Sequence, residues 1–200
     1  MRNKIGTFCM VMGTVLVLAA LSLYVGNQRE AEQAERAVDE IMPQLHELLE
    51  IPALEIPTSG IPNPFDPAMT EVEIDGYYYI GYLSVPSLGL ELPVMSEWDY
   101  TRLKIAPCRY AGSTKTDDLV IAAHNYARHF GTLTQLSVGD TVLFTDMDNV
   151  VSRYEVAELE TLEPTAIESM TAGEYDLTLF TCTYGGKSRV TVRCDRVDAL

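Results

Sequence analysis

Positive charge is scarce in this chain. Its 200 residues include 14 Lys and Arg against 29 Asp and Glu, so the formal net charge is −15 at pH 7. No basic patch is present along the sequence. Phosphate groups of nucleic acids and anionic lipid headgroups repel such a surface. Nucleic-acid binding is therefore excluded.

Cysteine is also scarce, with four in the whole chain. Cys9 lies in an apolar N-terminal run, which leaves Cys108, Cys182 and Cys194 for the rest of the protein. Because three is an odd number, at least one of these thiols stays unpaired within the chain. A disulfide between Cys108 and Cys194 that leaves Cys182 free is one arrangement that fits, and the sequence does not decide it.

One long apolar run spans residues 5–25, which is the length that a helix needs to cross a bilayer. Arg2 and Lys4 lie in the tip formed by residues 1–4, and acidic residues follow the run. The positive-inside rule then predicts a single-pass membrane protein with a cytoplasmic N-terminus and the rest of the chain outside. The alternative is a signal peptide cleaved near Ala20-Leu21-Ser22. Both interpretations predict that the rest of the chain is exported across the membrane.

Residues 26–71 connect this run to the rest of the protein. They begin with an acidic stretch rich in Glu, Ala and Gln, which favours a helical stalk up to an interruption at Pro43. Five prolines between residues 51 and 67 exclude helix and central strand, which predicts an extended linker. Residues 72–200 remain as one domain, long enough for its own core.

Short apolar segments separated by turn residues make up this domain. Their spacing predicts an all-β barrel or sandwich, with helix limited to residues 97–104 and 164–170. Strands do not alternate with long helices, so the pattern does not indicate a parallel sheet. The predicted strands are 78–85, 90–94, 119–124, 141–145, 151–162, 175–182 and 189–197.

Three reactive side chains stand at the ends of these predicted strands. Cys182 ends an apolar strand that leads into a glycine turn. His124 ends another strand, and Arg189 begins the strand after the turn. A free thiol has a pKa of about 8.5, so it needs a base or a cation nearby to act as a nucleophile at neutral pH. Together the three side chains indicate acyl transfer.

His129 and Arg193 compete for the same roles. His129 is predicted to lie in a loop, where it contacts substrate or is solvated. His124 is favoured because a strand end presents its side chain rigidly. Arg193 is predicted to share a face with Arg189 but to lie farther from the thiol, in an ordinary outward ion pair.

These residues belong to a wider pattern. The run Thr178-Leu179-Phe180-Thr181-Cys182 matches a TLxTC signature, with Arg189 seven residues later. Gly139-Asp140 precedes another predicted strand. Together with the strand that ends at His124, this pattern resembles the sortase family over residues 76–200.

The resemblance implies a closed eight-stranded β-barrel and a membrane-anchored cysteine transpeptidase. Cys182 would be the nucleophile that forms a thioester, His124 the general acid and base, and Arg189 the group that stabilises the oxyanion. The implied substrates are surface proteins or pilins with an LPxTG-like C-terminal sorting signal. The implied acceptor is an amine of cell-wall precursor or a pilin lysine. The lack of an evident aromatic lid other than Phe65 mildly favours wall anchoring.

Some sortases also use calcium, and some triads have a third carboxylate. Asp118, Asp140 and Asp195 could orient the histidine, although each also suits a turn or strand edge. Ligands with EF-hand spacing are absent, so no cofactor and no metal site is predicted. The carboxylates that could otherwise gather around calcium are Asp146, Asp148, Glu163, Glu168 and Glu174.

Two other functions fit the same residues. A cysteine endopeptidase would use Cys182 and His124 with water as the acceptor. A non-catalytic, membrane-tethered all-β adhesion or scaffold domain would bury Cys182 as an unreactive thiol. Products formed with and without an added amine separate the first from a transpeptidase, and alkylation of the thiol tests the second.

Overall fold

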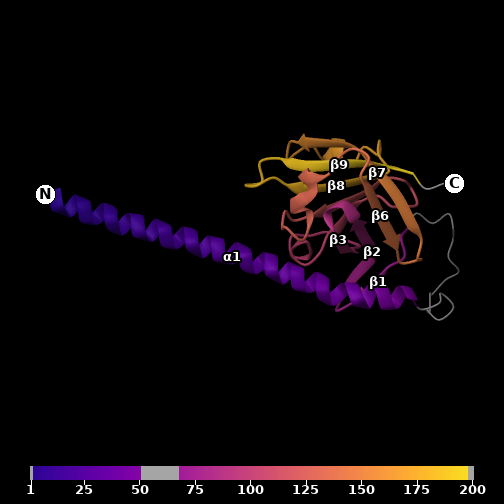
Figure 1. Cartoon of the computed structure of the whole chain (residues 1–200), viewed down its shortest axis with the longest axis horizontal. Coiled ribbons are helices and arrows are strands. Elements are labelled where there is room, and N and C mark those ends of the chain that lie inside the picture. The colour runs from indigo at the N-terminus through magenta and orange to yellow at the C-terminus, as the bar shows by residue number, and fades with distance from the viewer. Residues whose placement is uncertain (1, 51–67, 198–200) are drawn as a thin grey trace.

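The computed structural model describes residues 2–50 and 68–197, with side chains from residue 6 onward. It consists of one long helix and a barrel of strands that packs against the C-terminal half of that helix (Figure 1). The predicted Pro-rich linker lies outside the described residues.

The helix α1 (Arg2–Glu50) is continuous and is long and apolar enough to cross a membrane. Its predicted interruption at Pro43 is wrong. Proline removes one backbone hydrogen bond, but Ile41 and Leu45 on either side are buried against the barrel and hold the helix in place. The C-terminal part of the predicted helical stalk is therefore part of the core of the barrel domain.

Eight strands close into a barrel, as predicted. Around the barrel the order is β2, β3, β4, β5, β8, β9, β7 and β6, and β6 pairs back with β2. A further short strand, β1 (Val72–Ile74), pairs with the start of β2. The barrel strands are β2 (Tyr77–Val85), β3 (Leu90–Met95), β4 (Cys108–Ala111), β5 (Leu119–Ala123), β6 (Thr141–Asp146), β7 (Val151–Leu162), β8 (Leu177–Cys182) and β9 (Arg189–Arg196).

Short helices occupy the connections between strands. Two of them, η2 (Arg102–Lys104) and α2 (Ile167–Met170), fall within the predicted helical segments but are shorter. The others are η1 (Pro86–Leu88) and η3 (Phe130–Gln135). The strands β1 and β4 were not predicted, because three or four residues are too few to show the two-residue period of a strand.

Two neighbouring pairs of strands, β3–β4 and β5–β8, are parallel, which the sequence did not indicate. The connection from β5 to β8 runs through β6 and β7, so no long crossover helix is needed. Because β5 and β8 are parallel neighbours, their C-terminal ends lie at the same end of the barrel.

Of the two arrangements that the sequence left open for Cys108 and Cys194, the structure shows the free one, and both residues are buried. Two strands, β5 and β8, lie between the strands that carry them. Strands are spaced by about 4.8 Å, so the two Cα atoms are farther apart than the roughly 7 Å that a disulfide allows. Burial raises the pKa of each thiol to about 12, which makes both unreactive.

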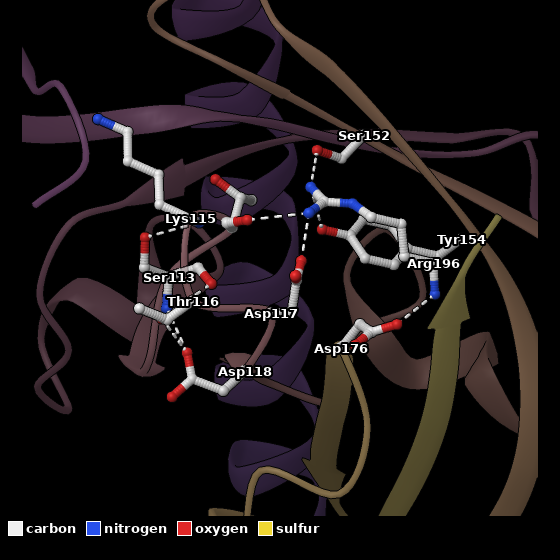
Figure 2. Close-up of polar contacts among 10 residues, drawn as sticks. Ser113, Lys115, Thr116, Asp117, Asp118, Ser152, Tyr154, Asp176 and Arg196 are labelled. Carbon is white, nitrogen blue, oxygen red and sulfur yellow. Dashed lines mark hydrogen bonds and ion pairs between the residues drawn. The ribbon is translucent and has the colours of Figure 1, made fainter. Parts of the chain in front are cut away.

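Arg196 lies at the end of the barrel opposite Cys182, because Cys182 pairs with Arg189 at the other end of β9. Figure 2 shows the polar contacts of Arg196. Its guanidinium donates to the Thr114 carbonyl over 3.1 Å and contacts the Asp117 carboxylate and the Ser152 hydroxyl. Its backbone N–H donates to the Asp176 carboxylate over 2.6 Å. These contacts connect the loop before β5 to β7 and β9, and they fix the far end of the strands that carry the predicted site.

Candidate active site

Cys182 and His124 lie at one end of the barrel because their strands are parallel neighbours. Ala123 and Thr181 are register partners, and the Thr181 hydroxyl donates to the Ala123 carbonyl over 2.8 Å. Cys182 and His124 each come one residue after this pair. The structure therefore brings the predicted nucleophile and the predicted base to adjacent positions.

Arg189 begins β9 directly opposite Cys182 in the antiparallel ladder. Its guanidinium donates to the carbonyls of Gly186 and Ser188, each over 3.2 Å. These carbonyls belong to the turn between β8 and β9. The turn therefore holds a fixed cation in the same row of the sheet as the thiol, and a guanidinium has five N–H groups from which to donate.

The His124 ring is half-buried next to Tyr126, with 5.0 Å between ring centroids. Burial lowers the pKa of His124, the Glu30 carboxylate of α1 acts in the opposite direction, and Lys104 lowers the pKa further. The imidazole is therefore neutral at pH 7. Its Nε2 atom is buried and has no hydrogen-bond partner among the described residues.

None of the three aspartates considered as orienting groups approaches His124. Asp118 and Asp140 accept hydrogen bonds from the backbone of their own loops. Asp195 lies near the end of β9 that is remote from Arg189. The carboxylate that acts on His124 is Glu30, which was not predicted because the sequence of a helix does not indicate which strand end the helix passes.

Glu30 reaches the site through two contacts from α1. Its carboxylate accepts from the Lys104 ammonium over 3.0 Å and from the Tyr126 hydroxyl over 3.4 Å. Tyr126 in turn lies against the His124 ring. The helix that leads out of the predicted membrane span thus contributes a charged group at the edge of the site.

His129 is neither solvated nor available to substrate, which corrects the prediction. Its side chain is fully buried, and burial lowers its pKa to about 4. The tight turn into η3 places it there, since the Gly131 N–H donates to the Tyr126 carbonyl over 2.9 Å. A side chain at Gly131 would collide with the Asn125 carbonyl. His129 packs behind Tyr126 and is a structural residue.

Arg193 forms the predicted ion pair but does not point outward. It is buried, and its Nε donates to the Glu160 carboxylate over 2.7 Å. The guanidinium also donates to the Thr178 hydroxyl over 2.9 Å and to two carbonyls of α2. With every side of its fork engaged, Arg193 is less suited than Arg189 to a developing oxyanion.

A sequence model of the sortase domain matches residues 83–197, which include all three predicted catalytic residues. The chain belongs to the sortase family. It is 27% identical over 184 residues to sortase A of Bacillus anthracis, an alignment that covers 86% of this chain and 82% of that protein.

Solved sortase structures share the fold. Sortase C1 of Streptococcus agalactiae is 27% identical with a TM-score of 0.55, over 64% of this chain and 72% of that one. Sortase C1 of Streptococcus suis is 29% identical with a TM-score of 0.52, over 61% and 74%. The sortase family consists of cysteine transpeptidases, and this chain has the barrel on which that chemistry is built.

Aromatic side chains cluster near the face of β8 that carries Cys182, since residues two apart on a strand share a face. Phe180 lies two residues before Cys182, and its ring meets Tyr110 edge-on at 5.1 Å. Tyr110 also contacts Trp98 at 5.1 Å, and both line a hollow of about 420 Å³. These rings were not predicted as part of the site, because Tyr110 lies on β4, which is too short to be recognised as a strand from the sequence.

The carboxylates considered for calcium do not gather in one place. Asp146 and Asp148 lie at the turn between β6 and β7, whereas the three glutamates lie in the loop before β8. Among residues 2–50 and 68–197, no group of three or more His, Cys, Asp or Glu side chains is placed to hold a metal ion.

Proposed function

We propose that the protein is a membrane-anchored transpeptidase that cleaves an LPxTG-like sorting signal through a thioester on Cys182. The observation that carries this proposal is the parallel pairing of β5 with β8. Because of this pairing, His124 at the end of β5 and Cys182 at the end of β8 occupy neighbouring positions at the same end of the barrel. Arg189 opposite Cys182 supplies the cation that such a site requires.

The first half of the cycle forms the thioester. The Cys182 sulfur attacks the carbonyl carbon of the signal's threonine, while Arg189 donates to the oxyanion. The C–N bond then breaks, and the leaving amine takes a proton from protonated His124. Because the resting imidazole is neutral, only the fraction of enzyme that holds a thiolate beside an imidazolium is competent.

The second half transfers the acyl group. An incoming amine gives its proton to His124 and attacks the thioester carbon, and the C–S bond breaks to restore the thiol. The amine belongs to cell-wall precursor or to a pilin lysine, and the protein's relatives include both sortase A and sortase C1. The apolar part of α1 would anchor the enzyme with its N-terminus in the cytoplasm, so that transfer takes place outside the cell.

Intact mass spectrometry of the full chain in detergent tests this function. Wild-type protein and Cys182→Ala are incubated with LPxTG-like peptides, with and without triglycine. We expect a peptide adduct on the wild type alone, which triglycine converts to an amide product. An adduct discharged only to the free acid would instead assign a cysteine endopeptidase. No adduct, together with a thiol that resists alkylation, would leave an adhesion or scaffold domain.

A further inference from the structure

The helix α1 meets the barrel a short distance after its apolar run. The run ends at Val25, and Glu30, five residues later, contacts Lys104 and Tyr126 of the barrel domain. A helix rises about 1.5 Å per residue, so this contact lies about 8 Å along the helix from the end of the run. The helix is continuous through both. The position of the barrel relative to the apolar run is therefore fixed.

This spacing is close to the thickness of a layer of lipid headgroups. The hydrocarbon core of a bilayer is about 30 Å thick and the whole bilayer about 40–45 Å, which leaves roughly 6 Å of headgroups on each side. Tyr24, next to the end of the apolar run, is 62% exposed, and tyrosine is enriched where hydrocarbon meets headgroups. If α1 spans a bilayer, the barrel therefore begins at the outer edge of the headgroups.

The side of the barrel that is nearest the apolar run carries the predicted site. Tyr126, which contacts Glu30, lies against the ring of His124. In Figure 1, β9 ends on the right, at the C-terminus of the chain, and begins on the left, on the side toward which α1 leaves the barrel. The turn that joins β8 to β9, residues 183–188, therefore points toward the plane in which the apolar run ends.

This turn presents an aromatic side chain that the protein leaves uncovered. Tyr184 is 92% exposed, more than any other large apolar or aromatic side chain in the described part of the chain. The backbone around it is held, because the Thr183 N–H donates to the Ser188 carbonyl over 2.9 Å and the Gly186 N–H to the Thr183 carbonyl over 2.8 Å. A Cβ at Gly185 or Gly186 would meet no atom of the described residues within 4 Å. A fixed turn thus holds Tyr184 out into open space.

The surface near the apolar run is less acidic than the protein as a whole. The chain carries a net charge of −15, yet residues 183–188 include no Asp or Glu. The carboxylates of α1 nearest the run are each in an ion pair: Glu30 with Lys104, Glu32 with Arg36, and Glu35 with Arg128. Anionic headgroups repel free carboxylates over about 10 Å at an ionic strength of about 0.1 M. The charges therefore favour this side of the protein, rather than its acidic remainder, next to a lipid surface.

We propose that the turn between β8 and β9 rests on the outer leaflet of the bilayer that α1 spans, with Tyr184 among the lipid headgroups. A tyrosine ring is apolar and its hydroxyl is polar, so both are satisfied at this boundary. Cys182 lies two residues before Tyr184, which is about 7 Å of extended chain. The thiol is thus held at the edge of the headgroup layer. The inference rests on the proposed function, because it assumes that α1 anchors the enzyme in the membrane.

Tryptophan fluorescence measures this contact, because Trp98 is the one tryptophan of the chain. The full chain with Trp98→Phe and Tyr184→Trp is placed in phosphatidylcholine–phosphatidylglycerol vesicles, with or without a lipid that carries a quenching nitroxide on its headgroup. We expect the nitroxide lipid to quench this protein. The matched control is Trp98→Phe with Tyr78→Trp, which should keep its fluorescence. Tyr78 is 50% exposed and pairs with β1, on the right in Figure 1 and away from the apolar run.

A longer helix tests whether α1 sets the contact. Seven helical residues inserted after Gly26 lift the barrel by about 10 Å and rotate it by only about 20°, so the quenching of the Tyr184→Trp protein should be lost. Absent quenching, equal quenching of the Tyr78→Trp control, or quenching that survives the insertion would overturn the inference. Each of these results leaves the transpeptidase intact if peptide adducts still form on Cys182. A full chain that does not float with the vesicles would instead refute the proposed membrane anchor, and the inference with it.

Discussion

Cys182 and Arg189 are register partners across the β8–β9 ladder, yet the Arg189 guanidinium donates its hydrogen bonds to the carbonyls of Gly186 and Ser188. The turn thus fixes the cation beside the thiol before any substrate arrives. Such preorganised donors are the ones that contribute most to stabilising an oxyanion, because they need no rearrangement during the reaction.

Arg189→Lys should therefore lower kcat for acylation by about 100-fold, with a much smaller change in KM. Lysine keeps the positive charge but lacks the planar fork that holds two carbonyls and an oxyanion together. Lys187→Met, an exposed cation of the same turn, is the control and should leave kcat unchanged. A variant Arg189→Lys with wild-type kcat would contradict the oxyanion role.

Glu30→Gln should shift the acidic limb of the pH profile of kcat/KM to lower pH and reduce its maximum. Burial lowers the pKa of His124 and the Glu30 carboxylate partly offsets this, so the variant leaves Lys104 unopposed and the pKa falls further. A lower pKa means that a smaller fraction of enzyme holds the imidazolium that protonates the leaving amine. Glu32→Gln, which loses only an exposed pair with Arg36, should keep the wild-type profile. An unmoved acidic limb would show that α1 does not act on the site.

Much of the site could be read from the sequence, because its signals are local. The sequence alone shows a thiol at the end of an apolar strand, a histidine at the end of another and an arginine after a glycine turn. The closed barrel was predicted from the resemblance to sortases that these residues carry. Glu30 and Tyr110 were missed for a different reason. Their roles depend on which elements meet in space, and α1 and β4 carry no sequence signal for that meeting. The parallel pairing of β5 with β8 is likewise a property of the whole topology.

His129 should make the stability of the fold depend on pH. Its pKa is about 4 in the folded protein against 6.5 when unperturbed. Between these two pH values the unfolded chain binds a proton at His129 that the folded chain does not bind. The contribution of the neutral His129 to the free energy of unfolding is therefore complete above pH 6.5 and is lost as the pH falls toward 4. The loss reaches about 3 kcal/mol over this range. Thermal unfolding followed by fluorescence should show a shallower pH dependence for His129→Leu than for the wild type. Parallel curves for wild type and His129→Leu would contradict a buried neutral imidazole.

Leu45→Ala should destabilise the barrel although residue 45 belongs to the predicted stalk. Leu45 is 0% exposed and lies in the same apolar core as the strands, so its truncation should cost about 2–4 kcal/mol and lower the melting temperature of the full chain. Leu21→Ala, in the exposed apolar half of the same helix, removes the same atoms from a surface that makes no contact with the barrel and should leave the melting temperature unchanged. Equal melting temperatures for Leu45→Ala and wild type would place the start of the folded domain at residue 72, as predicted from the sequence. A large drop would mean that one rigid helix joins the predicted membrane span to the catalytic barrel, so that the span itself sets the distance of Cys182 from the membrane.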